Sequence, residues 1–186
     1  MSFDDIRILI IRHAEKPDPE RGIEGVDEKG SRDPASLSPR GWQRAGALAC
    51  AFSVAAIADQ LSFRPQRIYA SRSSAKGKVS RRSIQTVMPL ADKLRIAVDT
   101  RFGRGDEESL VQDAALGVNP VLISWQREGI PAIVSHLVGD VRPEIPAAWP
   151  SDRFDLIWAL TRSAKAWSFT QIPQSFLSGD REEPIA

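Results

Sequence analysis

The segment IRILIIRHAEKP, residues 6–17, decides the architecture of this chain. Its first half, IRILII, is short, rich in β-branched residues and nearly continuous in apolar character. Such a run is typical of a strand that is covered on both faces inside a parallel sheet. The apolar run ends abruptly at Arg12, and His13 follows it. We therefore expect a buried strand that carries a cation and an imidazole at its carboxyl end.

Strand and helix patterns alternate along the rest of the chain. Ser38 and Pro39 supply an N-cap and a first helical position, so a helix is expected to begin there and to run to about Ala58. Further helices are expected at 84–94, 106–116 and 131–138, and further strands at 67–70, 121–125, 154–160 and 167–172, the last two as a hairpin. This order predicts an α/β three-layer sandwich, in which a mostly parallel central sheet has helices on both faces.

Length and composition favour one folded domain that spans residues 1–186. The 25 Lys and Arg against 24 Asp and Glu give a net charge of +1, so the whole chain has no general attraction to nucleic acid or to an anionic membrane. One cysteine and two histidines indicate neither an internal disulfide nor a metal site. The start is not signal-like, and no apolar run approaches the ~20 residues that span a bilayer, so we expect a cytoplasmic protein without metal or cofactor.

Polar residues follow three of the expected strands at their carboxyl ends. Arg12 and His13 follow the first strand, Ser71 follows the second, and Gln126 and Arg127 follow the VLISW strand. Parallel strands place their carboxyl ends on one edge of a sheet, and α/β proteins bind their ligands at that edge. The sequence therefore predicts that these side chains meet at one binding edge.

A run of basic residues lies between Asp59 and Asp92, where no acidic residue occurs. It contains seven cations: Arg64, Arg67, Arg72, Lys76, Lys78, Arg81 and Arg82. Three interpretations remain open: a solvated surface, a pocket in which arginine binds phosphate through two oxygens, or a nucleic-acid surface. Nucleic acid is disfavoured, because only Phe63 and Tyr69 are interspersed as stacking residues.

Several motifs resemble those of the histidine phosphatase superfamily, the phosphoglycerate mutase-like proteins. IRHAEKP resembles the family's Arg-His-Gly-Glu-type first motif, and LSPRGWQRA is similar to its Leu-Thr-x-x-Gly helix start. IYAS with RRSIQT resembles the Ala-Ser-x-x-x-Arg-Ala-x-Gln-Thr block. VLISWQREGIP resembles the strand and loop that deliver a second histidine. The last part, WSFTQIPQSFLSGD, is similar to the ending of a small bacterial branch, so the resemblance spans nearly the whole chain.

This resemblance implies a phosphoglycerate mutase-like fold and hydrolysis of phosphate monoesters. By position, His13 is the nucleophile that becomes phosphorylated, and Arg12 and Arg82 grip the phosphate. Ser71 and Glu15, which lie in the matching motifs, complete the expected phosphate-binding set. The implied ligand is a small phosphorylated molecule or free phosphate, and neither a metal nor a cofactor is needed.

The acid that protonates the leaving group is less sharply defined by the resemblance. Family members carry it either in the acidic segment before a helix or just after the second histidine. The favoured residue here is Glu107, and Asp106, Glu108 and Glu128 remain as alternatives.

One departure from the family concerns the second histidine. Members of the similar branch have Trp-Glu-His where this chain has Trp125, Gln126 and Arg127. Arg127 can bind a phosphate oxygen, but it cannot transfer a proton, because its pKa lies above ~12. Three functions follow in order of preference: a phosphatase that is weakened by the change, a catalytically impaired binder of a phosphorylated ligand or protein partner, and a nucleic-acid-binding module. The natural substrate and the oligomeric state stay open.

Overall fold

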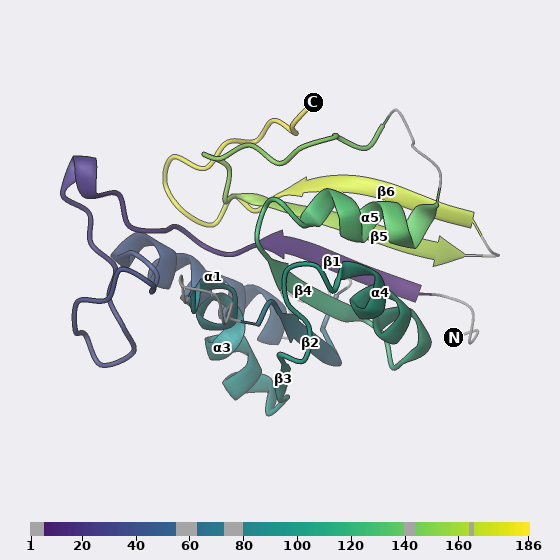
Figure 1. Ribbon diagram of the computed structural model, residues 1–186, viewed down its shortest axis with the longest axis horizontal. Coiled ribbons are helices and arrows are strands. Elements are labelled where there is room, and N and C mark those ends of the chain that lie inside the picture. Colours follow the sequence, from purple (N-terminus) through teal and green to yellow (C-terminus); the bar gives the residue numbers. More distant parts are fainter. Residues whose placement is uncertain (1–5, 55–62, 73–79, 140–143, 164–165) are drawn as a thin grey trace.

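A computed structural model describes residues 6–54, 63–72, 80–139, 144–163 and 166–186 of the chain. Six strands in these residues form one sheet in the order β3-β2-β4-β1-β5-β6 (Figure 1). β1, β4, β2 and β3 run parallel to one another, whereas β5 and β6 run antiparallel to their neighbours. The bounds are β1 Ile6–Arg12, β2 Arg67–Ala70, β3 Val98–Asp99, β4 Val121–Trp125, β5 Leu156–Ser163 and β6 Ala166–Pro173.

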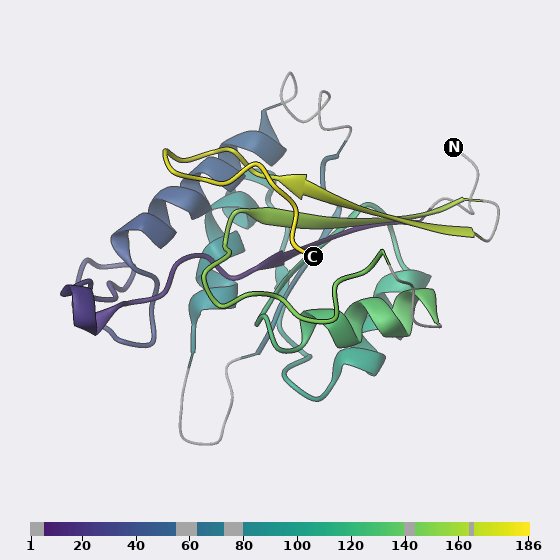
Figure 2. The ribbon, with the colours of Figure 1, turned by 90° about the horizontal axis from the view of Figure 1, so that it is seen from above.

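Helices cover both faces of the sheet. On one face α1 (Pro39–Ser53) packs against α3 (Arg82–Leu94), and on the other α4 (Glu107–Leu116) packs against α5 (Ile130–Val138). A single 3-10 turn, η1 (Pro19–Arg21), lies in the long segment between β1 and α1. The two helix pairs lie on opposite sides of the strands in the view from above (Figure 2). The expected three-layer α/β sandwich is confirmed.

β1 shows why the run IRILII is apolar throughout. Ile8 and Ile10 pack in the cluster that includes α4 and α5, while Leu9 and Ile11 pack in the cluster that includes α1 and α3. All four side chains are buried, with at most 4% exposed. Successive side chains of a strand point to opposite faces, so a strand between two helical layers must be apolar at every position.

The carboxyl ends of the central strands lie together at one edge of the sheet. Arg12 is the register partner of Trp125, and Ala70 is the partner of Ser124. Just beyond the strands, the backbone N–H of His13 donates to the carbonyl of Trp125. Because β5 runs antiparallel to β1, the loop that precedes β5, at 149–155, comes to the same edge. This loop forms one more side of any binding site at that edge, and the strand pattern of the sequence did not predict it.

The boundaries of some elements differ from the expected ones. The first helix was expected to run to about Ala58, but it ends at Ser53, and Val54 is already extended. The remainder of that expectation falls in residues 55–62, outside the described part of the chain. β3 was not expected, since two residues carry no readable period. The hairpin of β5 and β6 is confirmed, and no helix in the described residues is long and apolar enough to cross a membrane.

Candidate active site

A cavity of about 400 Å³ opens at the carboxyl edge of the sheet, and it is called the phosphate cavity below, after the ligand that we propose for it. The ends of β1, β2 and β4 meet there with the start of α3 and two loops. Its lining residues are Arg12, His13, Lys16, Ser71, Arg72, Ser80, Arg82, Ser83, Arg104, Gln126, Arg127, Glu128 and Ser151. Six of these side chains are basic and one is acidic, so the cavity attracts anions although the whole chain is nearly neutral.

His13 is held in one tautomer at the floor of this cavity. Its side chain is buried, and its Nδ1 lies 2.8 Å from the carbonyl oxygen of Ala14. A carbonyl only accepts hydrogen bonds, so Nδ1 carries the proton and the lone pair lies on Nε2. The pKa of His13 is lowered from 6.5 to about 3, mainly by burial and further by the positive charges of Arg12 and Arg82, while the hydrogen bond to Ala14 opposes the shift. The imidazole is therefore neutral and nucleophilic at neutral pH.

Arg12 is fixed by backbone groups of the loop that precedes β5. Its Nη1 donates to the carbonyls of Pro150, Ser151 and Arg153 at 3.1, 2.8 and 2.9 Å. The ring of Phe154 lies 3.8 Å from the centre of the guanidinium. Burial, together with Arg127, lowers the pKa of Arg12 to about 10, so the group stays charged at neutral pH. Its Nε is buried and has no hydrogen-bond partner in the described residues.

Arg82 and Gln126 present two more buried donors of this kind. Arg82 is the first residue of α3, and its Nη1 donates to the carbonyl of Pro34 at 3.3 Å. The Nε of Arg82 and the Nε2 of Gln126 are both buried and without a partner among the described residues. A buried donor without an acceptor costs about 1–3 kcal/mol. The three residues that carry these donors line one cavity, and such a set suits an oxyanion, which accepts several hydrogen bonds at once.

The block RRSIQT positions this site through three side chains on one side of α3. Arg82 lines the cavity. Thr86, four residues on, accepts the N–H of Ala14 at 2.8 Å and donates to the carbonyl of Arg82 at 2.7 Å. Gln85 accepts the N–H of Leu37 at 3.0 Å. Residues three and four apart share a helix face, so one face of α3 both lines the cavity and ties the His13 loop in place.

The start of α1 supports the same loop from the other side. The Ser38 side chain accepts the N–H of Gly41, which confirms the expected N-cap, and the N–H of Ser38 donates to the carbonyl of Glu15 at 2.9 Å. A Cβ on Gly41 would lie 2.5 Å from that same carbonyl oxygen. Glycine is therefore required at this position, because it lets the helix approach the backbone that follows His13.

Several solved structures have a similar fold, and two of them are phosphatases in complex with tungstate. The protein histidine phosphatase SixA complexed with tungstate matches at 16% identity and a TM-score of 0.51, over 90% of this chain and 97% of its own. The ecdysone phosphate phosphatase EPPase from Bombix mori, also in complex with tungstate, matches at 13% identity and a TM-score of 0.51, over 97% of both chains. The chain has the phosphoglycerate mutase-like fold. No protein-family model and no curated protein matches the sequence.

Most of the expected site residues line the phosphate cavity of this fold. His13, Arg12, Arg82, Ser71 and Arg127 all do so. Arg127 is 38% exposed, its Nε pairs with Glu128 at 3.0 Å, and its Nη1 lies 3.5 Å from the carbonyl of Trp149. The structure thus brings together residues that are more than a hundred positions apart in the chain.

Two expected residues do not line the cavity. Both carboxylate oxygens of Glu107 accept hydrogen bonds, one from the indole of Trp125 at 3.1 Å and one from the N–H of Gly105 at 2.8 Å. Glu15 pairs with the buried Arg44 at 2.7 Å and with Arg40 at 3.2 Å. Both carboxylates therefore hold neighbouring segments together.

The alternative acids differ from Glu107 in their surroundings. Asp106 accepts the N–H of Gly103 at 2.9 Å and pairs with Arg72, and Glu108 is exposed on α4. Glu128 is the acidic side chain that lines the phosphate cavity. No group of three or more His, Cys, Asp or Glu in the described part of the chain is arranged to hold a metal ion.

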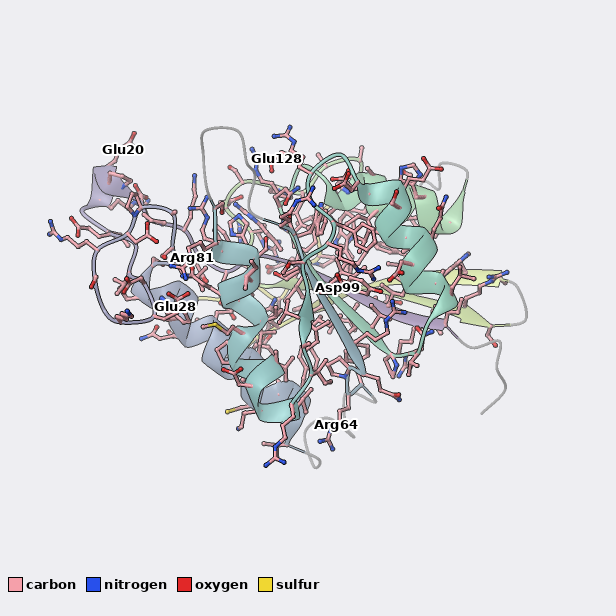
Figure 3. The ribbon with its side chains drawn as sticks, turned by 60° about the horizontal axis from the view of Figure 1, so that its bottom comes forward. Glu20, Glu28, Arg64, Arg81, Asp99 and Glu128 are labelled. Atoms are coloured by element: carbon pink, nitrogen blue, oxygen red, sulfur yellow. The ribbon has the colours of Figure 1, made fainter. Side chains whose placement is uncertain are left out.

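The described cations of the basic run between Asp59 and Asp92 do not gather on one face of the molecule. Arg67 pairs with Asp113 at 2.6 Å and Arg72 with Asp106 at 3.1 Å, while Arg81 pairs with Glu28 at 2.8 Å. Arg64 lies at the opposite end of the molecule from Glu128, which marks the phosphate cavity (Figure 3). Lys76 and Lys78 lie outside the described residues. The described cations of this run that reach the cavity are Arg72 and Arg82.

Sequence reasoning assigned no role to Gln126, Thr86 or Phe154. Gln126 had a visible signal, since it directly follows a buried strand at the binding edge, and Thr86 is the last residue of the RRSIQT block. Thr86 and Phe154 act through contacts with Ala14 and Arg12, which lie far away in the sequence. Nothing in a single sequence marks such contacts.

Proposed function

We propose that this chain is a member of the histidine phosphatase superfamily and that it hydrolyses phosphate monoesters through a phosphohistidine at His13. One observation carries the proposal: Arg12, Arg82 and Gln126, each with a buried donor that has no partner in the described residues, line the same cavity as an imidazole that is neutral and has its lone pair on Nε2. The similar folds of SixA and EPPase, both named phosphatases and both solved with tungstate, support it.

In the first step, Arg12, Arg82 and Gln126 donate hydrogen bonds to the phosphoryl oxygens, and Nε2 of His13 attacks phosphorus. The N–P bond forms as the bond from phosphorus to the ester oxygen breaks, and the leaving oxygen takes a proton. The three fixed donors act where charge is spread over the transferring group, and fixed donors of this kind need no reorganisation during the reaction.

In the second step, water attacks the phosphohistidine. The N–P bond breaks, His13 regains its neutral imidazole, and inorganic phosphate is released. We assign the proton transfers of both steps to Glu128, because it lines the cavity while Glu107 is fully occupied by Trp125 and Gly105. In its protonated form Glu128 donates a proton to the leaving oxygen, and the resulting carboxylate, which can pair with Arg127, then removes a proton from the attacking water.

Arg127 takes the position of the second histidine in this proposal. It adds a fixed positive charge for the phosphoryl group, but it cannot exchange protons. Its pairing with Glu128 also favours the runner-up function, a catalytically impaired relative that binds a phosphorylated ligand, since the ion pair restrains the carboxylate that must transfer protons. A fixed cation that binds the ground state as well as the transition state would give binding without acceleration.

The deciding experiment measures phosphate release from p-nitrophenyl phosphate, with and without a chelator, by the parent, by His13→Ala and by His136→Ala. His136 is an exposed histidine on α5 and serves as the matched control. We expect release by the parent and by His136→Ala, insensitive to chelator, and none by His13→Ala. Release that survives His13→Ala would overturn the assignment of the nucleophile.

A parallel titration of inorganic phosphate by calorimetry separates the two functions. Phosphate binding together with turnover supports the phosphatase. Phosphate binding by a parent chain that releases no product supports the impaired binder. A parent chain that neither binds phosphate nor releases it would reject both.

A further inference from the structure

A second cavity of about 740 Å³ adjoins the phosphate cavity. Residues 15–23, the start of α1, the 151–155 loop and the 179–181 segment line it. Lys16 and Ser151 line both cavities, so the two meet at these residues. Its volume lies within the roughly 300–1,000 Å³ of pockets that enclose small molecules. The protein thus holds a space for a group much larger than a phosphate directly beside the phosphate cavity.

One wall of the second cavity is a buried ion network that fixes its shape. Arg44 is 2% exposed and pairs with Glu15 and with Asp180, each at 2.7 Å. Asp180 also accepts the N–H groups of Phe176 and Leu177, both at 3.0 Å. Because every partner in this network is paired, the C-terminal segment is held firmly against the loop that follows His13.

A second wall connects this cavity to the phosphate site. Phe154 lines the second cavity. Its ring also lies 3.8 Å from the guanidinium of Arg12, and its centre is 6.1 Å from the ring centre of His13. A group that contacts the outer face of Phe154 is therefore separated from Arg12 and His13 by this one side chain.

The two cavities differ sharply in charge. The phosphate cavity has six basic side chains against one acidic side chain, whereas the described lining of the second cavity has six acidic side chains against five basic ones. Each arginine in that second lining already has a carboxylate partner, the looser exposed pairs being Arg21 with Asp18 at 3.6 Å and Arg181 with Asp152 at 3.0 Å. None of the unpartnered buried donors of the described residues lies there. Apart from Lys16, which the second cavity shares with the phosphate cavity, the cations of this described lining are already paired with carboxylates, so a second phosphate there would face carboxylates that outnumber the unpaired cation.

We propose that the second cavity holds the leaving group of the phosphate monoester and selects a bulky, polar and uncharged one, such as a sugar or a nucleoside, against any leaving group that carries a second phosphate. This inference rests on the proposed function of the phosphate cavity. It narrows the substrate class to monophosphates, because like charges brought together in a binding site cost several kcal/mol.

The test compares fructose 6-phosphate with fructose 1,6-bisphosphate, which differ by one phosphate group. Binding of each to His13→Ala is measured by calorimetry, so that affinity is read without turnover. We expect the monophosphate to bind at least about tenfold more tightly than the bisphosphate. The parent chain, assayed for release of phosphate from the same two sugars, should show the same order in kcat/KM.

Charge reversal within the second cavity sharpens the test. Asp152 is an exposed carboxylate that lines this cavity, and Asp152→Lys should reduce the preference for the monophosphate by about fivefold, since attraction then replaces repulsion. Glu20→Lys reverses another acidic charge of the same cavity, on η1, and it is the second variant to measure if Asp152→Lys does not fold. Asp92→Lys is the matched control: Asp92 is exposed near the far end of α3, about 15 Å along the helix from Arg82, and its reversal should leave the preference unchanged.

The outcomes separate this inference from the proposed function. Equal or tighter binding of the bisphosphate overturns the inference, and so does a preference that neither Asp152→Lys nor Glu20→Lys alters. Binding of inorganic phosphate without measurable binding of either sugar phosphate overturns it too. The expected binding order in a parent chain that hydrolyses nothing would support the selection by the second cavity and reject the phosphatase.

Discussion

Acid should destabilise the parent chain more than a His13→Asn variant, because His13 is buried as a neutral imidazole. Burial, and then repulsion from Arg12, Arg82 and Lys16, lowers the pKa of His13 from 6.5 to about 3 in the folded protein. The unfolded chain binds a proton at this imidazole below pH 6.5, while the folded chain does not until about pH 3. Stability is therefore lost as the pH falls through this window, and His13 contributes no pH dependence above it.

The size of the effect follows from the two pKa values. Within the window the unfolded chain holds one more proton, so each pH unit costs about 1.4 kcal/mol of unfolding free energy. Between about pH 7.5 and about pH 4.5 the parent should therefore lose about 3 kcal/mol more than His13→Asn. That is a large part of the ~5–15 kcal/mol that stabilises an ordinary domain.

Urea unfolding of both chains at four pH values between about 7.5 and 4.5 measures this difference. The carboxylates of Asp33, Asp155 and Asp180 have lowered pKa values, from hydrogen bonds to Ser36, Arg153 and Arg44 respectively, and they also lose stability in acid. These losses occur in both chains and cancel when the two curves are subtracted. A difference that stays constant with pH would refute the buried, neutral imidazole and with it the nucleophile proposed above.

Three further changes test the residues around His13. Thr86→Val leaves the buried N–H of Ala14 without its acceptor, so it should cost about 1–3 kcal/mol in urea unfolding and lower phosphate release, while Thr86→Ser should keep most of the release. Glu107→Gln should lower stability by about 1–2 kcal/mol, because its amide cannot accept from both Trp125 and Gly105, yet the pH profile of phosphate release should keep its shape. Arg127→His should raise turnover in a slow parent chain, since an imidazole can exchange protons.

Each of these changes has an outcome that contradicts it. Unaltered stability and release in Thr86→Val would mean that α3 does not hold the His13 loop. A pH profile that loses one limb in Glu107→Gln would restore Glu107 as the proton donor. An unchanged or lower rate in Arg127→His would count against the idea that Arg127 occupies the place of a second histidine.

The order of elements was readable from the sequence because each element has its own local signal. The run IRILII predicts a strand between two layers, and the structure packs its alternate side chains into two separate clusters. Ser38 and Pro39 marked the start of α1, and Ser38 caps that helix. The end of α1 and the two-residue strand β3 were not readable, because tertiary contacts rather than local pattern decide where short elements begin and end.

The binding edge was also predictable, since parallel strands with polar residues at their carboxyl ends must bring those residues together. Arg12, Ser71 and Arg127 meet at the phosphate cavity for this reason. The assignment of carboxylates was not predictable in the same way. Glu15 lies two residues from His13, yet it pairs with Arg44 and Arg40 rather than with the cavity.

The sequence by itself determined the layers, the succession of most elements along the chain, and the edge of the sheet at which the expected site residues gather. These depend on local periodicity and on the direction of parallel strands. Only the tertiary structure decided which polar groups are free to act. One buried donor each of Arg12, Arg82 and Gln126 has no partner among the described residues. Glu107, in contrast, accepts hydrogen bonds from Trp125 and Gly105, and Asp180 pairs with Arg44, 136 residues away in the chain. Whether a charge binds a ligand or supports the fold depends on the groups that packing brings next to it, and those groups come from distant parts of the chain.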